Sequence, residues 1–149
     1  MNPDFCDLLR ALSDAGARFL VVGAYAVSFH SEPRATGDLD IWIDPTAENA
    51  ARVYLALGAF GAPVSELAES DLVTPDLVFQ IGLPPRRIDI MTTITGVSFE
   101  EAWTSRSEAT YGDVGFQIIG IDALMKNKKA LGRPKDLVDL ELLRRHHPH

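Results

Sequence analysis

Three aspartates occur in a pattern that suits metal-dependent chemistry. Asp38 and Asp40 are separated by one residue in a predicted strand over 38–43, so both side chains should point to the same face. Asp89 lies between two isoleucines in a second predicted strand over 87–91, and should face away from the core that the isoleucines enter. If these strands are neighbours, three carboxylates converge, and a divalent cation would offset their repulsion. Such oxygen ligands suit magnesium.

An Asp-x-Asp pair alone is weak evidence, because a solvated aspartate at a strand end gives the same pattern. A glycine turn upstream strengthens the interpretation. Gly23-Ala24 joins a buried strand over 19–22 to a predicted helix over 25–29. The free N–H groups at a helix N-terminus bind phosphate, although a tight strand-to-helix turn would explain the dipeptide equally well. Next to the aspartates, the turn predicts a nucleotide site.

The order of the predicted strands and helices indicates an α+β domain with a mixed β-sheet, flanking helices and a C-terminal helical pair over about 122–145. Gly82 to Pro85 suits a hairpin between strands over 77–81 and 87–91, and two further strands are expected over 105–111 and 114–119. Helices are expected over 4–15, 46–57, 123–131 and 135–145, with a helical turn over 98–103, whereas 58–75 has no clear assignment. The whole chain, 1–149, is expected to form one domain.

Composition narrows the class of protein. The 149 residues are 46% hydrophobic and 23% charged, which is typical of a globular protein. No apolar run approaches the roughly 20 residues of a membrane span, and the N-terminus does not resemble a signal peptide. Cys6 is the only cysteine, which fits a reducing compartment, so we expect a cytoplasmic protein without membrane contact.

The net charge of −7 is unevenly distributed. Residues 124–149 carry +4 and residues 1–123 carry −11. The acidic part would bind magnesium and repel a polyanion, whereas the basic tail could hold one. Alternatively, the lysines and arginines of the tail simply face water.

The segments Val21–Tyr25 and Pro33–Ile41 resemble the signature of the nucleotidyltransferase superfamily related to polymerase beta. In that superfamily a Gly-Gly or Gly-Ser turn precedes an Asp-x-Asp strand, and a third aspartate lies on a later strand. The Arg-x-Thr-x-Asp-Leu-Asp spelling over 34–40 is closer to the branch of AbiEii-type toxins, and 124–139 resembles the C-terminal helices of that branch.

The resemblance implies a role for each matching residue. Asp38 and Asp40 would bind Mg²⁺, or Mn²⁺ in its place, and Asp89 would complete the metal site and help to activate the acceptor hydroxyl. The residues implied at the nucleotide are Gly23, Ala24, Arg34, Thr36 and Lys128. Ala24 departs from the family, because it removes the serine hydroxyl that could contact phosphate.

The implied reaction transfers a nucleoside monophosphate from a nucleoside triphosphate to an acceptor hydroxyl. The acceptor would be RNA, such as tRNA, or protein, and an antitoxin protein would be a partner of a toxin. A carboxylate-metal phosphohydrolase or nuclease and a catalytically inactive relative that binds nucleotide or a partner stay open. The sequence fixes neither the preferred nucleotide nor the oligomeric state.

Several residues also have simpler interpretations. Lys128 could lie on a solvated helix face, and Arg34 could pair with Glu32 or Asp38. His30 is expected to cap a helix or lie at the surface. The histidines at 146, 147 and 149 are expected to fray, and Asp122 is expected to cap the helix over 123–131.

Overall fold

A mixed six-stranded sheet forms the centre of the protein. The computed structural model describes residues 1–34 and 36–148. The strand order is β3-β4-β2-β1-β6-β5, with β1 parallel to β6 and antiparallel to β2, and β2 parallel to β4. The strands are β1 (Phe19–Val22), β2 (Leu39–Ile43), β3 (Val78–Ile81), β4 (Ile88–Met91), β5 (Ser107–Tyr111) and β6 (Val114–Ile118). All six strands expected from the sequence are present.

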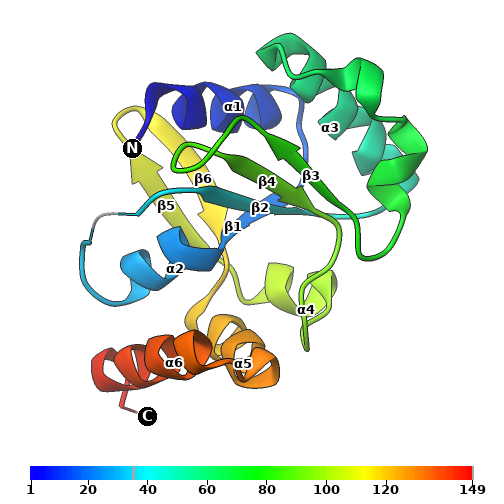
Figure 1. The fold of residues 1–149 in the computed structure, drawn as a ribbon. Coiled ribbons are helices and arrows are strands. Elements are labelled where there is room, and N and C mark those ends of the chain that lie inside the picture. Colours follow the sequence, from blue (N-terminus) through cyan, green and yellow to red (C-terminus); the bar gives the residue numbers. More distant parts are fainter. Residues whose placement is uncertain (35, 149) are drawn as a thin grey trace.

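Helices cover both faces of the sheet (Figure 1). One face is covered by α1 and α3, and the other by α2, against which the C-terminal pair α5 and α6 packs. The helices are α1 (Pro3–Asp14), α2 (Gly23–His30), α3 (Ala47–Phe60), α4 (Phe99–Thr104), α5 (Ile121–Leu131) and α6 (Pro134–His146). The unassigned stretch over 58–75 contains the end of α3 and two short 3-10 helices, at Val64–Glu66 and Glu69–Val73.

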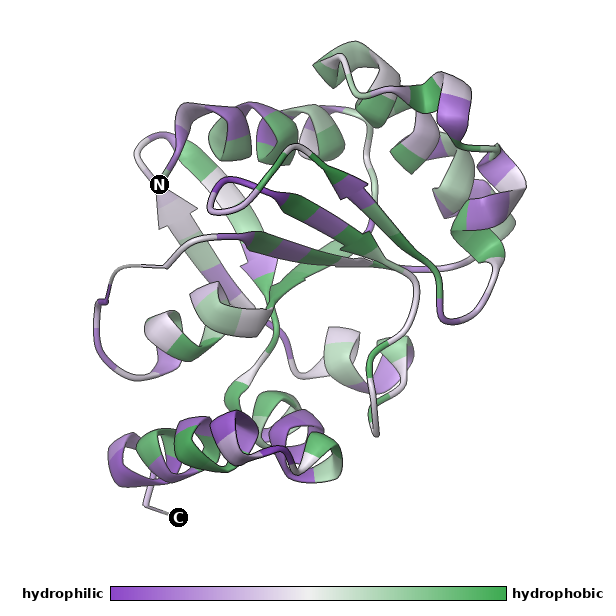
Figure 2. Ribbon diagram, viewed as in Figure 1, coloured by the Kyte–Doolittle hydropathy of each residue, from purple (hydrophilic) through white to green (hydrophobic). Residues whose placement is uncertain are grey.

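Alternation of residue types explains which face of each strand enters the core. Leu39, Ile41 and Ile43 of β2 are fully buried, and so is Ile90 of β4. Figure 2 shows the apolar residues concentrated on these central strands, with hydrophilic residues on the outer sides of the helices. No helix within residues 1–34 and 36–148 is long and apolar enough to cross a bilayer.

The start of α5 differs from the expected cap at Asp122. The N-cap is Gly120, and Asp122 lies in the first turn, where its charge favours the positive end of the helix. A Cβ atom on Gly120 would lie 2.0 Å from the carbonyl oxygen of Ser105. This close approach excludes a capping side chain at position 120, so the helix begins without one.

Candidate active site

The two strands that carry the aspartates lie side by side. In the parallel pair β2 and β4, Asp40 is in register with Asp89, and Asp40 is also opposite Val22, the last residue of β1. Asp38 immediately precedes β2, and its Oδ1 accepts a hydrogen bond of 3.0 Å from the backbone N–H of Arg87. The three carboxylates therefore gather at one place on the sheet, as the alternation of residues predicted.

Gly23 brings the start of α2 directly against this cluster. Its φ angle is +69°, which favours glycine, and a Cβ atom at this position would lie 2.1 Å from Oδ2 of Asp40. No side chain caps the N-terminus of α2. The first backbone N–H groups of this eight-residue helix thus lie next to a carboxylate. Phosphate bound at the N–H groups and a cation bound at the carboxylate would therefore be neighbours.

Arg87 is the cation that the carboxylates contact within the protein itself. Its Nε donates to Oδ1 of Asp89 at 2.8 Å, and a terminal nitrogen lies 3.5 Å from Oδ2 of Asp38. These contacts raise the pKa of Arg87, chiefly through the hydrogen bond to Asp89. Among the described residues, no three histidine, cysteine or acidic side chains are arranged closely enough to hold a metal ion. The guanidinium group occupies oxygen atoms that a metal would need.

Asp40 is the carboxylate with the most perturbed ionisation. Burial, followed by the charges of Asp89 and Asp38, raises its pKa to about 6, while the charges of Arg87 and Lys128 act in the opposite direction. A buried carboxylate that faces two others has a strong requirement for positive charge. The three carboxylates are therefore of the chemical type that binds a divalent cation, whereas their arrangement, with Arg87 bound to Asp38 and Asp89, does not form a metal site among the described residues.

Lys128 is buried rather than solvated, which contradicts the interpretation of a simple exposed helix face. Its Nζ lies 3.2 Å from Asp139 and 3.5 Å from Asp136, two carboxylates on α6. Arg34 also pairs with Asp139, at 3.6 Å, and not with Glu32 or Asp38 as the sequence suggested. Asp139 therefore holds both basic side chains expected at the nucleotide.

Sequence reasoning missed Arg87, Asp136 and Asp139. Arg87 and Asp89 are two residues apart on a strand and so share a face, a signal that could have revealed their pairing. Asp136 and Asp139 are three apart on a helix and face the same neighbour. Asp136 is fully buried and also accepts hydrogen bonds from Arg133.

The histidines differ from their expected roles. His30 is buried, with Nε2 at 2.7 Å from the carbonyl oxygen of Ile119, so it is neither a cap nor a surface residue. Burial is the main cause that lowers its pKa. His147 does not fray, because its Nε2 lies 2.7 Å from the carbonyl oxygen of His30. His149 lies outside the described residues.

Comparison with known proteins identifies the fold. No known family profile matches the sequence, and no curated protein matches it. Solved structures do. A candidate nucleotidyltransferase from Thermotoga maritima superposes with a TM-score of 0.60 at 14% identity, over 95% of this chain and 92% of that one. ANT(2″)-Ia in complex with adenylyl-2″-tobramycin superposes with a TM-score of 0.58 at 14% identity, over 93% and 84%.

The chain has a nucleotidyltransferase-like fold. This confirms the predicted mixed sheet with flanking helices and a C-terminal helical pair. At 14% identity the likeness establishes the fold, and the residue roles depend on the geometry described above.

Proposed function

We propose that this protein is a nucleotidyltransferase that transfers a nucleoside monophosphate from a nucleoside triphosphate to an acceptor hydroxyl. The observation that carries the proposal is the contact between the start of α2 and Asp40, which only glycine at position 23 permits. It joins an uncapped helix N-terminus, a structure that can bind phosphate, to a cluster of three carboxylates. A turn with only a structural role would not require three carboxylates beside it.

The chain's own residues would position and balance the charges. Backbone N–H groups at Gly23 and Ala24 would receive the phosphates, with Lys128 supplying positive charge from α5. Asp38, Asp40 and Asp89 would hold Mg²⁺, or Mn²⁺ in its place, which when bound supplies charge neutralisation and polarises the phosphoryl group. Arg34 and Thr36, which also line a neighbouring cavity, would border the nucleotide on the side of that cavity.

The reaction balances without a covalent enzyme intermediate. The acceptor oxygen forms a bond to the α-phosphorus while the bond from that phosphorus to the bridging oxygen breaks, and pyrophosphate leaves. The hydroxyl proton passes to Asp89, whose oxygens keep accepting capacity beside the hydrogen bonds from Arg87. Positioning and electrostatic stabilisation then account for most of the catalysis.

A thermal-shift measurement tests the nucleotide site. Each nucleoside triphosphate is added with magnesium to the wild type, to Asp40→Asn and to Asp113→Asn, a control at an exposed hairpin carboxylate. A ligand at 100 times its Kd stabilises the folded state by about 2.7 kcal/mol, so the melting temperature of the wild type and of the control should rise. Asp40→Asn should show little rise. Equal nucleotide affinity in all three proteins would contradict the proposal.

One observation favours a second candidate, a relative that binds nucleotide without catalysis. Arg87 already neutralises Asp38 and Asp89, and Ala24 lacks the serine hydroxyl. Arg87→Ala separates the two functions. In a metal-dependent enzyme the variant should bind magnesium more tightly, because the carboxylates lose a competing cation. In a binding protein that uses Arg87 as its cation, the variant should lose nucleotide affinity at every magnesium concentration.

The resemblance to AbiEii-type toxins extends the proposal to a toxin with an antitoxin partner. Induced expression should then arrest growth, and Asp40→Asn should abolish the arrest at equal protein levels. Labelling extracts with each nucleoside triphosphate would identify the acceptor as RNA, protein or a small molecule. Growth arrest that persists in Asp40→Asn would separate toxicity from nucleotide transfer.

A further inference from the structure

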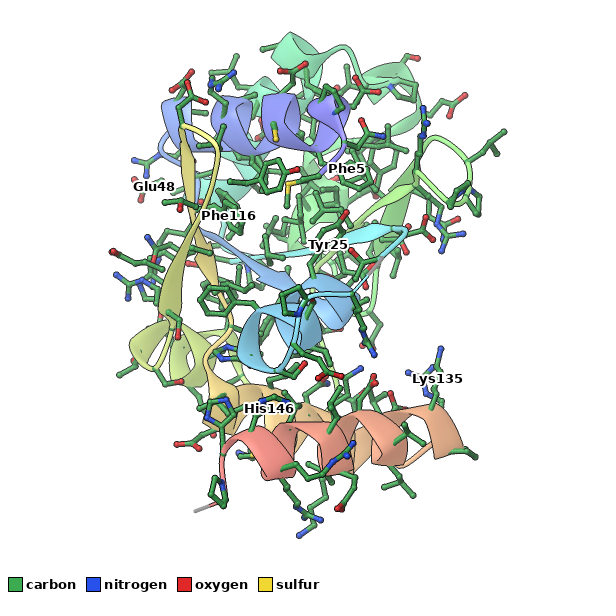
Figure 3. The ribbon with its side chains drawn as sticks, turned by 90° about the vertical axis from the view of Figure 1, so that its left-hand side faces the viewer. Phe5, Tyr25, Glu48, Phe116, Lys135 and His146 are labelled. Carbon is green, nitrogen blue, oxygen red and sulfur yellow. The ribbon has the colours of Figure 1, made fainter. Side chains whose placement is uncertain are left out.

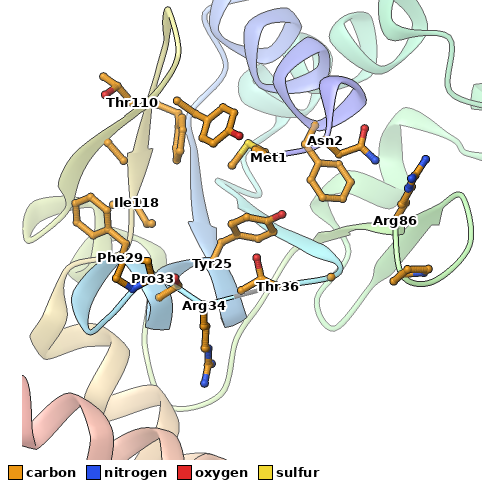
Figure 4. A pocket seen from close by; sticks show the side chains of 17 residues that line it. Met1, Asn2, Tyr25, Phe29, Pro33, Arg34, Thr36, Arg86, Thr110 and Ile118 are labelled. Carbon is orange, nitrogen blue, oxygen red and sulfur yellow. The ribbon is translucent and has the colours of Figure 1, made fainter.

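A cavity of about 580 Å³ lies next to the candidate active site. Its walls come from the start of α1, from α2, from residues 33, 34, 36 and 37, from the turn between β3 and β4, and from the hairpin of β5 and β6 (Figure 4). Pockets for small molecules range from about 300 to 1,000 Å³. The cavity therefore has the size of a complete small-molecule site.

Aromatic rings dominate the cavity. Phe5 and Tyr25 meet edge to face, with ring centroids 6.0 Å apart. Figure 3 shows Phe5, Tyr25 and Phe116 converging from α1, α2 and β6. Phe29 and Tyr111 also line the cavity, and 48% and 44% of their surfaces are exposed. Side chains of this kind bury a planar ring well, and exposed rings retain area that a ligand would cover.

The side chains that line the cavity favour a neutral or anionic ligand over a cationic one. None of the described residues that line it carries a carboxylate. Arg86 contributes positive charge and forms no ion pair within residues 1–34 and 36–148. Arg34 lines the same cavity, but Asp139 neutralises it. A neutral or anionic ring is therefore favoured over an amine.

Residues that line the cavity are adjacent in the sequence to residues of the carboxylate cluster. Gly37 lines the cavity, and the next residue is Asp38. Arg86 lines it too, and the next residue, Arg87, contacts Asp38 and Asp89. Tyr25 follows Gly23 by two positions in the first turn of α2. A ligand in the cavity would thus lie beside the place where the phosphates are proposed to bind.

We propose that this cavity binds the acceptor of the transfer, and that the acceptor is a small aromatic alcohol without positive charge. The proposal rests on the proposed nucleotidyltransferase function. The ring would occupy the aromatic cavity while a hydroxyl on its substituent reaches toward Asp38. That hydroxyl oxygen would bond to the α-phosphorus, its proton would pass to Asp89, and pyrophosphate would leave.

Charge favours a small molecule over RNA, because RNA would have to approach a body whose residues 1–123 carry a net charge of −11. RNA and protein acceptors are therefore the competing outcomes of the test.

The cavity itself is tested with 1-anilinonaphthalene-8-sulfonate, an aromatic anion whose fluorescence rises on apolar binding. Ala109→Phe fills the cavity from β5, and Ser28→Phe fills it from α2. Glu108→Phe places the same ring on the exposed, opposite face of β5 and serves as the matched control. We expect the wild type and the control to bind the dye, and each filled variant to bind it at least tenfold more weakly. Melting curves establish that the variants are folded.

The acceptor is tested with α-labelled nucleoside triphosphates, magnesium, and separated low-molecular-weight, RNA and protein fractions of a cell extract. We expect label in an anionic aromatic phosphodiester in the first fraction, and its loss in Ala109→Phe with nucleotide binding intact. Label on RNA or protein would overturn the small-molecule assignment. Equal dye binding by the wild type and both filled variants would overturn the assignment of this cavity as a ligand-binding site. A wild type that binds no nucleotide would reject the nucleotidyltransferase function and with it the acceptor role, whatever the dye shows.

Discussion

Replacement of Gly23 by alanine tests the contact on which the site depends. Two costs arise, and the structure separates them. An L-residue at φ +69° is strained by about 1–2 kcal/mol. The new Cβ would also lie 2.1 Å from Oδ2, 3.0 Å from Cγ and 3.1 Å from Cβ of Asp40, so the carboxylate must move. Forced repacking of this kind costs about 1–3 kcal/mol.

Gly16→Ala is the matched control, because Gly16 has a φ of +71° and no atom within 4 Å of the added Cβ. It should lose only the strain energy. Taking an excess of about 2 kcal/mol, Gly23→Ala should melt roughly 4–8 °C below Gly16→Ala. In an Asp40→Ala background most of that excess should vanish, since the carboxylate is gone.

The assay combines thermal melting with nucleotide titration in magnesium. Gly23→Ala should also lose nucleotide binding, whereas Gly16→Ala should retain it. Equal melting temperatures for the two variants, together with intact nucleotide binding in Gly23→Ala, would refute the idea that the start of α2 and Asp40 form one site.

Three further predictions concern neighbouring groups. Ala24→Ser should restore a hydroxyl contact to phosphate worth about 1 kcal/mol, which a titration would register as a roughly fivefold lower Kd for the nucleotide. Asp136→Ala removes a fully buried carboxylate from Arg133 and leaves Lys128 with Asp139 alone, which should lower the free energy of unfolding by about 3 kcal/mol in denaturant titrations. Asp40, with its pKa raised to about 6 mainly by burial, binds a proton more tightly in the folded than in the unfolded protein. Its stabilising contribution should therefore be complete below about pH 4 and lost as the pH rises through about 6, a dependence that Asp40→Asn removes when metal-free stability is measured across that range.

Local patterns predicted the sheet and the convergence of the aspartates. Alternation of aspartate with leucine and isoleucine specifies the face of a strand directly, because strand side chains have a period of two. Asp40 and Asp89 accordingly lie in register on neighbouring strands. The aspartates were expected to converge only if the two strands were neighbours, and the structure shows that they are.

Tertiary contacts account for what the sequence did not reveal. His30 is buried because Ile119, 89 positions later, provides a hydrogen-bond acceptor, and no local pattern encodes that encounter. The N-cap of α5 is Gly120, where the carbonyl oxygen of Ser105, a residue distant in the sequence, leaves no room for a side chain. Arg34 pairs with Asp139 on α6, which is distant in the sequence, whereas the sequence suggested only the nearby Glu32 and Asp38.

The structure shows which basic residues of the C-terminal segment, 124–149, form ion pairs within the protein. Lys126 pairs with Glu101 at 2.6 Å, Lys128 pairs with Asp139, and Arg133 pairs with Asp136. Asp136 and Asp139 lie within the segment and are already counted in its net charge of +4, so of these three pairs only the one between Lys126 and Glu101 lowers the charge that the segment offers to a polyanion. The buried Lys128 adds its charge to the field at Asp40, where it helps to lower the pKa that burial raises. Lys128 therefore contributes to the electrostatics of the carboxylate cluster, and its buried charge is not part of an RNA-binding surface.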